Sequence, residues 1–334
     1  MHTHQDLLFK DLTTLKVGGE ARRVIVPETR AECIRALEAE RNDFFILGGG
    51  SNVLAKDEPY TGVVYRMEFQ KITHADIDTE EVLVHVDAGT NWDVFVAHTV
   101  ENEWWGIENL SAIPGTVGGA VFQNIGAYGA ALSETCVSVD VYDHKDRRER
   151  TIKNEDCAFD YRTSIFKMHV PRYTILSATF RLSRTPAPCL DYRDLEEHFK
   201  DKNTPSAGEV RDAVCAIRKN KFPESGAYGS AGSFFLNPVL PEAEASIFQN
   251  TYPRMPIFSL PEGGVKIPLA WLLDHVVGAK GMRVGGALVW DKQPLVLATE
   301  DGATANDVRA LMRDVQRKVF ITTKLHITPE VRVM

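Results

Sequence analysis

The feature that most constrains this fold is an apolar strand that runs directly into a run of glycines. Phe44-Phe45-Ile46-Leu47 is continuously apolar, and Gly48-Gly49-Gly50-Ser51-Asn52 follows without a break. Glycines leave backbone N–H groups open to a ligand, so such a loop can hold a pyrophosphate. The spacing departs from the dinucleotide-binding fingerprint, because Val53 occupies the position of the third glycine. By itself the loop therefore predicts either a phosphate site or a tight turn.

A second glycine-rich stretch begins at Ser111. Its part from residue 115 to residue 129 contains five glycines and no charged residue. A backbone of this kind suits close contact with a large flat ligand, although close packing of a helix on a strand also explains Gly118 and Gly119. Two such loops in one chain favour a bound dinucleotide over two unrelated turns.

The surrounding pattern predicts a fold of mixed α and β structure. Val82, Val84 and Val86 alternate with outward residues, as in a half-buried strand, and a helix begins near Asn91. The first seventy residues are typical of a strand, a helix and a second strand. The elements predicted in the first half are strands at 23–26, 44–47, 62–66, 82–87, 136–142 and 173–182 and a helix at 29–41.

The second half contains a segment of a different kind. Residues 183–205 include three prolines and show no periodicity, which indicates an insertion or a lid. Ser206 and Glu209 form a capping box that opens a helix. That helix ends in the basic turn Arg218-Lys219-Asn220-Lys221, which could simply complement the helix dipole. Further helices are predicted at 268–277 and 306–319.

Composition excludes several classes of function. The chain has 38 Lys and Arg against 46 Asp and Glu, a net charge of −8, which argues against a nucleic-acid-binding protein. No apolar run approaches the roughly eighteen residues of a membrane span, and the first residues lack the pattern of a signal peptide. We expect a cytoplasmic protein without membrane insertion.

Cysteine and histidine spacing predicts no metal centre. The five cysteines form no Cys-x-x-Cys pair, and the ten histidines form no His-Glu-x-x-His cluster. Reduced, mostly buried thiols are expected, and nothing local supports a nucleophilic cysteine.

Six short motifs occur in a fixed order along nearly the whole chain. They lie at residues 17–19, 46–54, 113–129, 159–167, 231–235 and 329–332. In combination they resemble the family of UDP-N-acetylenolpyruvoylglucosamine reductases, flavoenzymes of bacterial peptidoglycan precursor synthesis. The combination is far more specific than either glycine loop alone.

The resemblance implies an α+β fold with an FAD-binding module of the vanillyl-alcohol-oxidase (PCMH) type. Residues 1–70 and 71–222 would form its two subdomains, with 183–205 as a lid-like insertion. Residues 223–334 would bind substrate, and their last strand would return Glu330 to the active site. NADPH would be the electron donor. FAD would be bound non-covalently, because Ser51-Asn52 offers no histidine for a covalent link.

The resemblance also implies an activity, the reduction of the enolpyruvyl ether of UDP-N-acetylglucosamine to UDP-N-acetylmuramate. Arg162, Glu330 and Ser233 match the family's catalytic residues. A planar, permanently charged guanidinium such as that of Arg162 suits the substrate carboxylate, and Glu330 would help to stabilise the intermediate. Ser233 would donate the proton, which requires a dry, hydrogen-bonded setting. Without the motifs, simpler explanations would be preferred: a surface ion pair for Arg162, a solvated tail residue for Glu330 and a turn hydroxyl for Ser233.

Residues for the ligands follow from the same motifs. Tyr192, inside 183–205, resembles a tyrosine that closes over substrate in the longer subtype of the family. Leu236 departs from the lysine of some relatives. Substrate binding is implied for Tyr161, Tyr192, Arg218, Lys221 and Asn237. FAD binding is implied for Gly48, Gly49, Gly50, Ser51, Asn52, Ser111, Ile113, Pro114, Gly115, Thr116, Gly118, Gly119, Gly126, Ala127, Tyr128 and Gly129.

Two rival functions stay open at this point. One is an oxygen-using oxidase on the same flavin fold, although many such enzymes tether FAD through a loop histidine that is missing here. The other is a non-catalytic nucleotide-binding protein, against which the presence of Arg162, Ser233 and Glu330 speaks. The partner expected is a nucleotide-sugar substrate, without nucleic acid, and the protein is expected to be a monomer.

Overall fold

The computed structural model describes residues 1–40, 43–202, 204–224, 226–260 and 263–334. The chain forms two compact units: unit 1 comprises 1–7, 21–49 and 61–219, and unit 2 comprises 8–20, 50–60 and 220–334. The boundary between them falls inside the first glycine loop, after Gly49. Mixed helix and strand content confirms the α+β prediction. The finer division at residues 70 and 222 stays a prediction.

Unit 1 contains a four-stranded sheet in the order β1 (His2–Leu8), β2 (Glu20–Val26), β5 (Tyr60–Tyr65), β3 (Phe44–Ile46). β3 runs parallel to β5. Helix α2 (Arg30–Ala39) buries Cys33 and Leu37 against β5 side chains. This is the strand–helix–strand arrangement that the apolar pattern predicts. Strand β1 has no such pattern, because most of its side chains are exposed.

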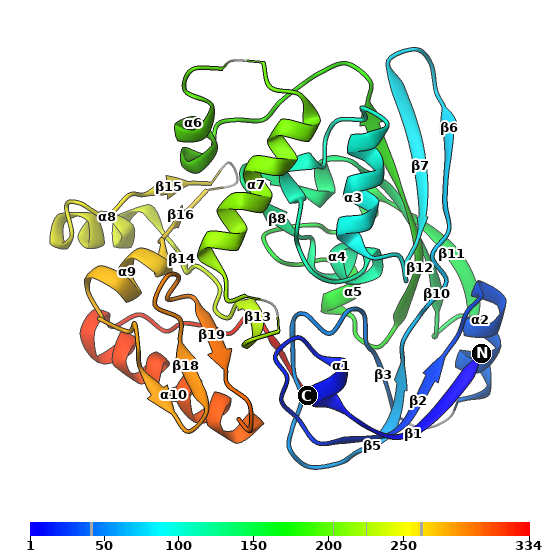
Figure 1. Cartoon of the computed structure of the whole chain (residues 1–334), viewed down its shortest axis with the longest axis horizontal. Helices are drawn as coiled ribbons and strands as arrows, with labels where there is room; N and C mark the ends of the chain where they lie inside the picture. The colour runs from blue at the N-terminus through cyan, green and yellow to red at the C-terminus, as the bar shows by residue number, and fades with distance from the viewer. Residues whose placement is uncertain (41–42, 203, 225, 261–262) are drawn as a thin grey trace. The chain divides into compact units, whose positions relative to one another are not determined.

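The second sheet of unit 1 is antiparallel and has five strands (Figure 1). Val82, Val84 and Val86 of β7 are fully buried and pack with helices α3 (Trp92–Glu101) and α4 (Val117–Gln123). The alternating pattern therefore identified the buried face correctly. The strand order is β11 (Arg148–Lys153), β10 (Cys136–Asp143), β12 (Tyr173–Ser183), β7 (Glu81–Asp87), β6 (Ile72–Asp76).

Helix α7 (Ala207–Lys221) begins at the predicted capping box. The Ser206 N–H donates to the Glu209 carboxylate at 2.9 Å, and the Glu209 N–H donates to the Ser206 hydroxyl at 3.3 Å. In the 183–205 segment, of which residue 203 lies outside the described residues, α6 (Arg193–Phe199) buries Leu195 and Phe199 against α7. The shorter elements of unit 1 are η1 (Glu108–Leu110), β8 (Gly126–Ala127), β9 (Ala130–Ala131), η2 (Leu132–Glu134), η3 (Asn154–Asp156) and α5 (Ile165–Met168).

Unit 2 is built on the amphipathic helix α10 (Ala305–Thr323). Val308, Leu311, Val315 and Val319 are fully buried, as their spacing predicts. One sheet has the order β13 (Gly229–Ser233), β19 (Val296–Thr299), β18 (Ala287–Val289), β17 (Arg283–Val284), and a smaller one β14 (Val239–Leu240), β16 (Val265–Lys266), β15 (Phe258–Ser259). The other helices are α1 (Phe9–Leu12), α8 (Glu242–Thr251) and α9 (Leu269–His275).

Two N-terminal segments belong to the core of unit 2. Leu15, Val17 and Leu54 join its buried apolar cluster. Strand β20 (Arg332–Val333) pairs in parallel with β4 (Val53–Leu54), directly after the first glycine loop. The Asp57 carboxylate also accepts hydrogen bonds of 2.8 and 2.9 Å from two amides at the start of α10. The end of the chain is thereby fixed beside residues 52–54.

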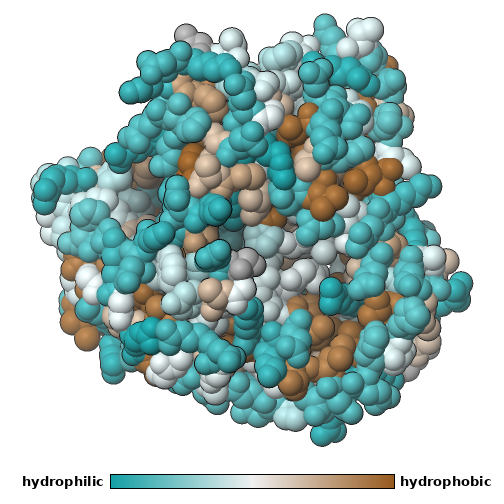
Figure 2. Space-filling model, viewed as in Figure 1, coloured by the Kyte–Doolittle hydropathy of each residue, from teal (hydrophilic) through white to brown (hydrophobic). Residues whose placement is uncertain are grey.

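Figure 2 shows a face on which hydrophilic residues predominate and apolar residues form separate, small patches. Exposed large apolar side chains are scattered along the chain, with Val94 of α3 59% and Ile321 of α10 64% exposed. Single exposed apolar residues of this kind are ordinary on proteins. None of the described helices is both long and apolar enough to span a membrane.

Candidate active site

The two glycine-rich loops predicted to bind FAD lie against each other in unit 1. A Cβ atom on Gly49 would come within 2.6 Å of the Gly115 Cα, and one on Gly48 within 2.8 Å of the Thr116 Oγ1. A larger residue at either position would push the loops apart. Glycine is therefore required here by the close approach of two segments that are distant in the sequence.

The backbone amides at this contact are open to a ligand. Among the residues that the structure describes, no acceptor receives a hydrogen bond from the N–H groups of Gly48, Gly49 or Gly115. Gly49 is exposed, and the other two glycines are partly exposed. Unpaired backbone amides are good partners for phosphate oxygens. The two loops therefore fit the pyrophosphate of FAD.

Other residues predicted to bind FAD have structural partners. Ser111 is fully buried, and its hydroxyl donates to the Glu108 carbonyl oxygen at 2.6 Å. Tyr128 and Gly129, with φ of 50° and 87°, form the two-residue turn between β8 and β9. Positive φ at both positions is typical of a tight hairpin turn. Gly129 thus has a conformational role that requires no ligand.

Arg162 lies in a tight turn of unit 1. Asp160 and Thr163 exchange two backbone hydrogen bonds of 3.2 and 3.0 Å, and Arg162 has a φ of 55°. Its guanidinium donates to the Gly126 carbonyl oxygen at 2.5 Å and to the Asn124 carbonyl oxygen at 3.5 Å. A Cβ on Gly126 would lie 3.2 Å from the Arg162 Nη1, so glycine leaves room for the guanidinium. Neutral carbonyls orient this cation without cancelling its charge.

Lys167 and Gln123, to which the sequence motifs assign no role, support this turn. The Lys167 Nζ donates to the Arg162 carbonyl oxygen and to the Gln123 Oε1, both at 2.9 Å. Gln123 is the last residue of α4, the helix that follows the second glycine loop. The Lys167–Gln123 contact spans 44 residues, and no local pattern links the two positions.

Unit 2 brings the segments of Ser233 and Glu330 side by side. The Glu330 N–H donates to the carbonyl oxygen of Phe234, the residue after Ser233, at 2.8 Å. The Glu330 carbonyl oxygen accepts from the Asn52 Nδ2 at 3.4 Å, so the end of the first glycine loop also lies here. Three segments to which the sequence analysis assigned functional residues thus meet in unit 2, whereas Arg162 belongs to unit 1.

Ser233 ends β13 after an irregularity in the strand. The pairing of β13 with β19 contains a register shift between Ser230 and Ser233, and Gly232 has a φ of 72°. Bulges of this kind re-aim a side chain at the end of a strand. Phe234 is fully buried. The Ser233 hydroxyl makes no hydrogen bond within the described part of the chain, so it is available to hydrogen-bond a ligand.

Helix α7 carries a partly buried cation against the second glycine loop. The Arg218 Nε donates to the Ala112 carbonyl oxygen at 3.1 Å. Two turns earlier, Arg211 makes two hydrogen bonds of 2.6 and 2.9 Å to the Asp93 carboxylate. Burial lowers the pKa of Arg218, although the neighbouring Tyr128 favours its charged form. A desolvated guanidinium is stabilised by an anionic ligand, so Arg218 suits a phosphate or carboxylate.

The predicted lid tyrosine packs onto the second glycine loop. The rings of Tyr192 and Tyr128 meet edge to face, with centroids 5.2 Å apart and an angle of 79°. Tyr192 is 40% exposed and Tyr128 only 7%. Burial raises the pKa of Tyr128 to about 12, so its hydroxyl keeps its proton at neutral pH.

The remaining predicted substrate residues have separate positions. Tyr161 shares the turn of Arg162, whose guanidinium carbon lies 5.6 Å from the centre of the tyrosine ring. Lys221 ends α7 and belongs to unit 2. The Asn237 Oδ1 accepts from the Leu269 N–H at 3.0 Å, at the start of α9. Part of the Asn237 amide therefore supports a helix terminus.

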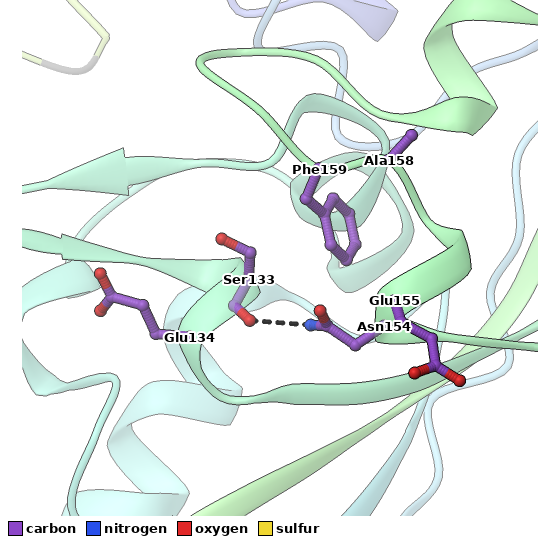
Figure 3. Close-up of a pocket in the computed structure, with 6 residues that line it drawn as sticks. All are labelled: Ser133, Glu134, Asn154, Glu155, Ala158 and Phe159. Carbon is purple, nitrogen blue, oxygen red and sulfur yellow. Dashed lines mark hydrogen bonds between the residues drawn. The ribbon is translucent and has the colours of Figure 1, made fainter. Parts of the chain in front are cut away.

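A cavity of about 330 Å³ in unit 1 contains none of the predicted site residues. Figure 3 shows its lining, in which the Asn154 side chain donates to the Ser133 carbonyl oxygen at 2.8 Å. The carboxylates of Glu134 and Glu155 lie on opposite sides of this hydrogen bond and do not converge. Nowhere in the described ranges do three His, Cys, Asp or Glu residues come together as a metal site. The lining residues are Ser133, Glu134, Asn154, Glu155, Ala158 and Phe159.

The most buried cysteines have the chemistry of inert thiols. Cys33, Cys136 and Cys157 are buried, and burial is the main cause that raises the pKa of each thiol to about 12. The thiolate is the nucleophilic form. These three residues therefore fill the core and do not react at neutral pH.

Two family models match separate parts of the chain. Residues 21–151 match an FAD binding domain, which includes both glycine loops. Residues 224–334 match the C-terminal domain of UDP-N-acetylenolpyruvoylglucosamine reductase, which includes Ser233 and Glu330. The Arg162 turn and the whole of α7 lie between the two matches.

Whole-chain comparisons agree with the two models. A protein of Neisseria meningitidis serogroup B named UDP-N-acetylenolpyruvoylglucosamine reductase is 40% identical over 331 residues, which cover 96% of this chain and 95% of that protein. A protein of the same name from Dechloromonas aromatica is 37% identical over 96% of this chain and 97% of its own. The crystal structure of UDP-N-acetylenolpyruvylglucosamine reductase from Thermus caldophilus superposes with a TM-score of 0.70 and 27% identity, over 100% of this chain and 99% of that chain. The chain therefore belongs to the UDP-N-acetylenolpyruvoylglucosamine reductase family.

Proposed function

We propose that the protein reduces the enolpyruvyl ether of UDP-N-acetylglucosamine to UDP-N-acetylmuramate, with FAD as cofactor and NADPH as electron donor, in peptidoglycan precursor synthesis. When bound, FAD carries a hydride from NADPH to the substrate double bond. Family membership supports this class of flavoenzyme. The structural observation that carries the proposal is the meeting of the Ser233, Glu330 and Asn52 segments in unit 2.

Arg162 binds the substrate carboxylate in this proposal. An enolpyruvyl ether is electron-rich, so its double bond accepts a hydride only when negative charge can flow into the carboxylate. A guanidinium forms two parallel hydrogen bonds with such a group and stabilises the developing charge. The Gly126 and Asn124 carbonyls support this role because they orient the cation before the substrate arrives. Glu330 stabilises the same charged intermediate together with Arg162.

Ser233 donates a proton to the carbon next to the one that receives the hydride. An alcohol is a weak acid, so the transfer needs a hydroxyl that is held close and shielded from water. Support comes from the bulge that ends β13, the buried Phe234 after it, and a hydroxyl that the described residues leave unoccupied. The proton passes to the substrate and is replaced from solvent after product release.

The other assignments concern binding. Arg218, Lys221, Tyr161, Tyr192 and Asn237 contact the substrate or NADPH, with Tyr192 on the lid segment 183–205. Residues 1–70 and 71–222 hold FAD, and residues 223–334 hold the nucleotide sugar. The protein acts as a monomer in the cytoplasm. The partly desolvated guanidinium of Arg218, beside the second glycine loop, supports an anionic ligand at this place.

Anaerobic absorbance measurements test the proposal. The purified protein is expected to be yellow, to lose its flavin absorbance on addition of NADPH, and to regain it on addition of the enolpyruvyl substrate. A colourless protein would support the binding-protein alternative, and recovery only with oxygen would support an oxidase. Acid precipitation should leave all the yellow colour in the supernatant, because the flavin is not covalently bound.

A further inference from the structure

Lys167 makes a hydrogen bond to the backbone of Arg162, which has an unfavourable conformation. Arg162 has a left-handed φ of 55°, which costs free energy for a residue with a side chain. The Lys167 ammonium donates to the Arg162 carbonyl oxygen at 2.9 Å. The direction of that carbonyl is set by the backbone conformation of Arg162. A charge-assisted hydrogen bond to that oxygen stabilises the turn in the orientation observed.

The ammonium is itself held by α4. Its second acceptor is the Gln123 Oε1, also at 2.9 Å, and the Gln123 side chain is buried. The next residue, Asn124, accepts from the Arg162 guanidinium and donates to the Asp160 carbonyl oxygen at 2.9 Å. One end of α4 therefore contacts both the backbone and the side chain of the Arg162 turn. The other end begins at the glycine loop predicted to bind FAD.

We propose that Lys167, held by Gln123, is a positioning residue that fixes the Arg162 guanidinium for the substrate carboxylate. This inference rests on the function proposed above for Arg162. It assigns Lys167 no contact with substrate or FAD: the residue acts through the Arg162 backbone alone. Since displacement of a catalytic group by about 1 Å can cost on the order of 100-fold in rate, loss of the ammonium should be visible in kinetics.

The test is a double-mutant cycle on the complete FAD-bound protein. Lys167→Met keeps the length and apolar stem of the side chain and removes the ammonium. It should slow reoxidation of the flavin by substrate about 10- to 100-fold when Arg162 is present, while flavin reduction by NADPH stays within twofold. In the Arg162→Ala background the same change should cost less than threefold, because no guanidinium is left to position. Lys167→Arg should restore part of the rate.

Substrate binding gives a readout that does not depend on turnover. Calorimetric titration of the oxidised protein should show weaker binding in Lys167→Met than in wild type, and no further weakening when the change is added to Arg162→Ala. Lys153→Met is the matched control, since Lys153 on β11 has a side chain that is 75% exposed. It should change neither measurement by more than twofold. Gln123→Met serves as a second variant. It should weaken substrate binding and slow reoxidation less than Lys167→Met does, and again only when Arg162 is present.

The outcomes separate this inference from the proposed function. If wild type recovers its absorbance with substrate and Lys167→Met reoxidises within twofold of wild type, the positioning role is wrong. An equal loss in both backgrounds, or parallel loss in both half-reactions, assigns Lys167 to general stability and also overturns it. If Lys167→Met does not fold, Gln123→Met takes its place. The positioning role is then wrong if Gln123→Met slows reoxidation equally with Arg162 present and in the Arg162→Ala background. If wild type itself is not reoxidised by substrate, the proposed function fails first.

Discussion

Arg162 and Ser233, the proposed charge-stabilising and proton-donating groups, have opposite surroundings. Arg162 makes hydrogen bonds through both its side chain and its backbone. Its guanidinium donates to the carbonyl oxygens of Asn124 and Gly126, and its own carbonyl oxygen accepts from Lys167. The Ser233 hydroxyl has no hydrogen-bond partner in the described ranges, and only its backbone is fixed, by the pairing of β13 with β19.

The difference matches the two kinds of chemistry. Stabilisation of developing charge is most effective when the cation is oriented before the reaction and does not have to move. A proton donor, in contrast, must exchange its hydrogen bond during the reaction, so a hydroxyl already engaged by the fold would be a poor one. We therefore expect Arg162 to be sensitive to geometry and Ser233 to be sensitive to acidity.

The largest effect is expected at Ser233. Ser233→Ala should still bind substrate and be reduced by NADPH at a normal rate, but reoxidation should fall by about 10²–10⁴-fold, as for loss of a general acid. Ser233→Cys should recover part of the rate, because a thiol is a stronger acid at the same position. Stopped-flow absorbance at the flavin band measures both steps. Turnover of Ser233→Ala within a few-fold of wild type would mean that the proton comes from another group.

A somewhat smaller effect is expected at Arg162. Arg162→Ala should slow reoxidation by about 10²–10³-fold, the usual cost of one preorganised charge-stabilising group. Arg162→Lys keeps the charge but loses the two-pronged geometry, so it should recover little. Full activity in the lysine variant would contradict the importance of geometry at this site.

An intermediate effect is expected from crowding the guanidinium. In Gly126→Ala the new Cβ would lie 3.2 Å from the Arg162 Nη1 and 3.1 Å from the Ala130 carbonyl oxygen, so the side chain must shift. Reoxidation should slow by about tenfold, more than reduction by NADPH, because the crowded group is Arg162. Gly208→Ala in α7, whose nearest neighbour would lie at 3.9 Å, is the control and should keep both rates. Equal rates in the two alanine variants would show that Arg162 is not tightly held.

The smallest effect on either half-reaction is expected from the ion pairs of the buried Asp143 carboxylate, which contact neither Arg162 nor Ser233. Burial opposes the charge of the Asp143 carboxylate, but hydrogen bonds from Arg172, from backbone amides and from Arg150 hold its pKa at about 2, below its usual 3.8. Because the folded-state pKa is the lower one, the stabilisation is complete above about pH 4. It amounts to about 2 kcal/mol and disappears as the pH falls through 2.

Urea unfolding of Asp143→Asn checks this expectation. The difference in free energy of unfolding from wild type should be largest at neutral pH and should shrink between pH 4 and pH 2. A difference that does not vary with pH would show that the carboxylate charge contributes nothing. Normal rates of both half-reactions in this variant would separate the scaffold from the site.

Much of the fold could be predicted because its apolar residues are periodic. The alternation of valines in β7 and the spacing of Val308, Leu311 and Val315 in α10 each identified a buried face correctly. Strands β1 and β6 were not predicted, because almost all of their side chains are exposed and leave no apolar pattern. A strand held mainly by backbone pairing at a sheet edge has no clear signature in its residues.

The candidate site could be predicted as a set of segments but not as an arrangement. Glycine content identified both loops, yet the Gly49–Gly115 contact became visible only when the loops were placed together. Lys167 and Gln123 lay inside recognised motifs without a role, because a contact across 44 residues follows from the path of the chain. A sequence motif gives residue types and their spacing, whereas contacts between distant residues follow only from the tertiary structure.

The separate roles of Arg162 and Ser233 are tested most directly by measuring both half-reactions in the same samples of wild type, Arg162→Ala and Ser233→Ala. Flavin reduction by NADPH and reoxidation by the enolpyruvyl substrate are followed anaerobically by stopped-flow absorbance. We predict reduction rate constants that agree within about twofold in all three proteins, and reoxidation at least about 100-fold slower in both variants. A parallel fall of reduction and reoxidation in either variant would contradict it, since that residue would then serve the structure and not the chemistry of the substrate.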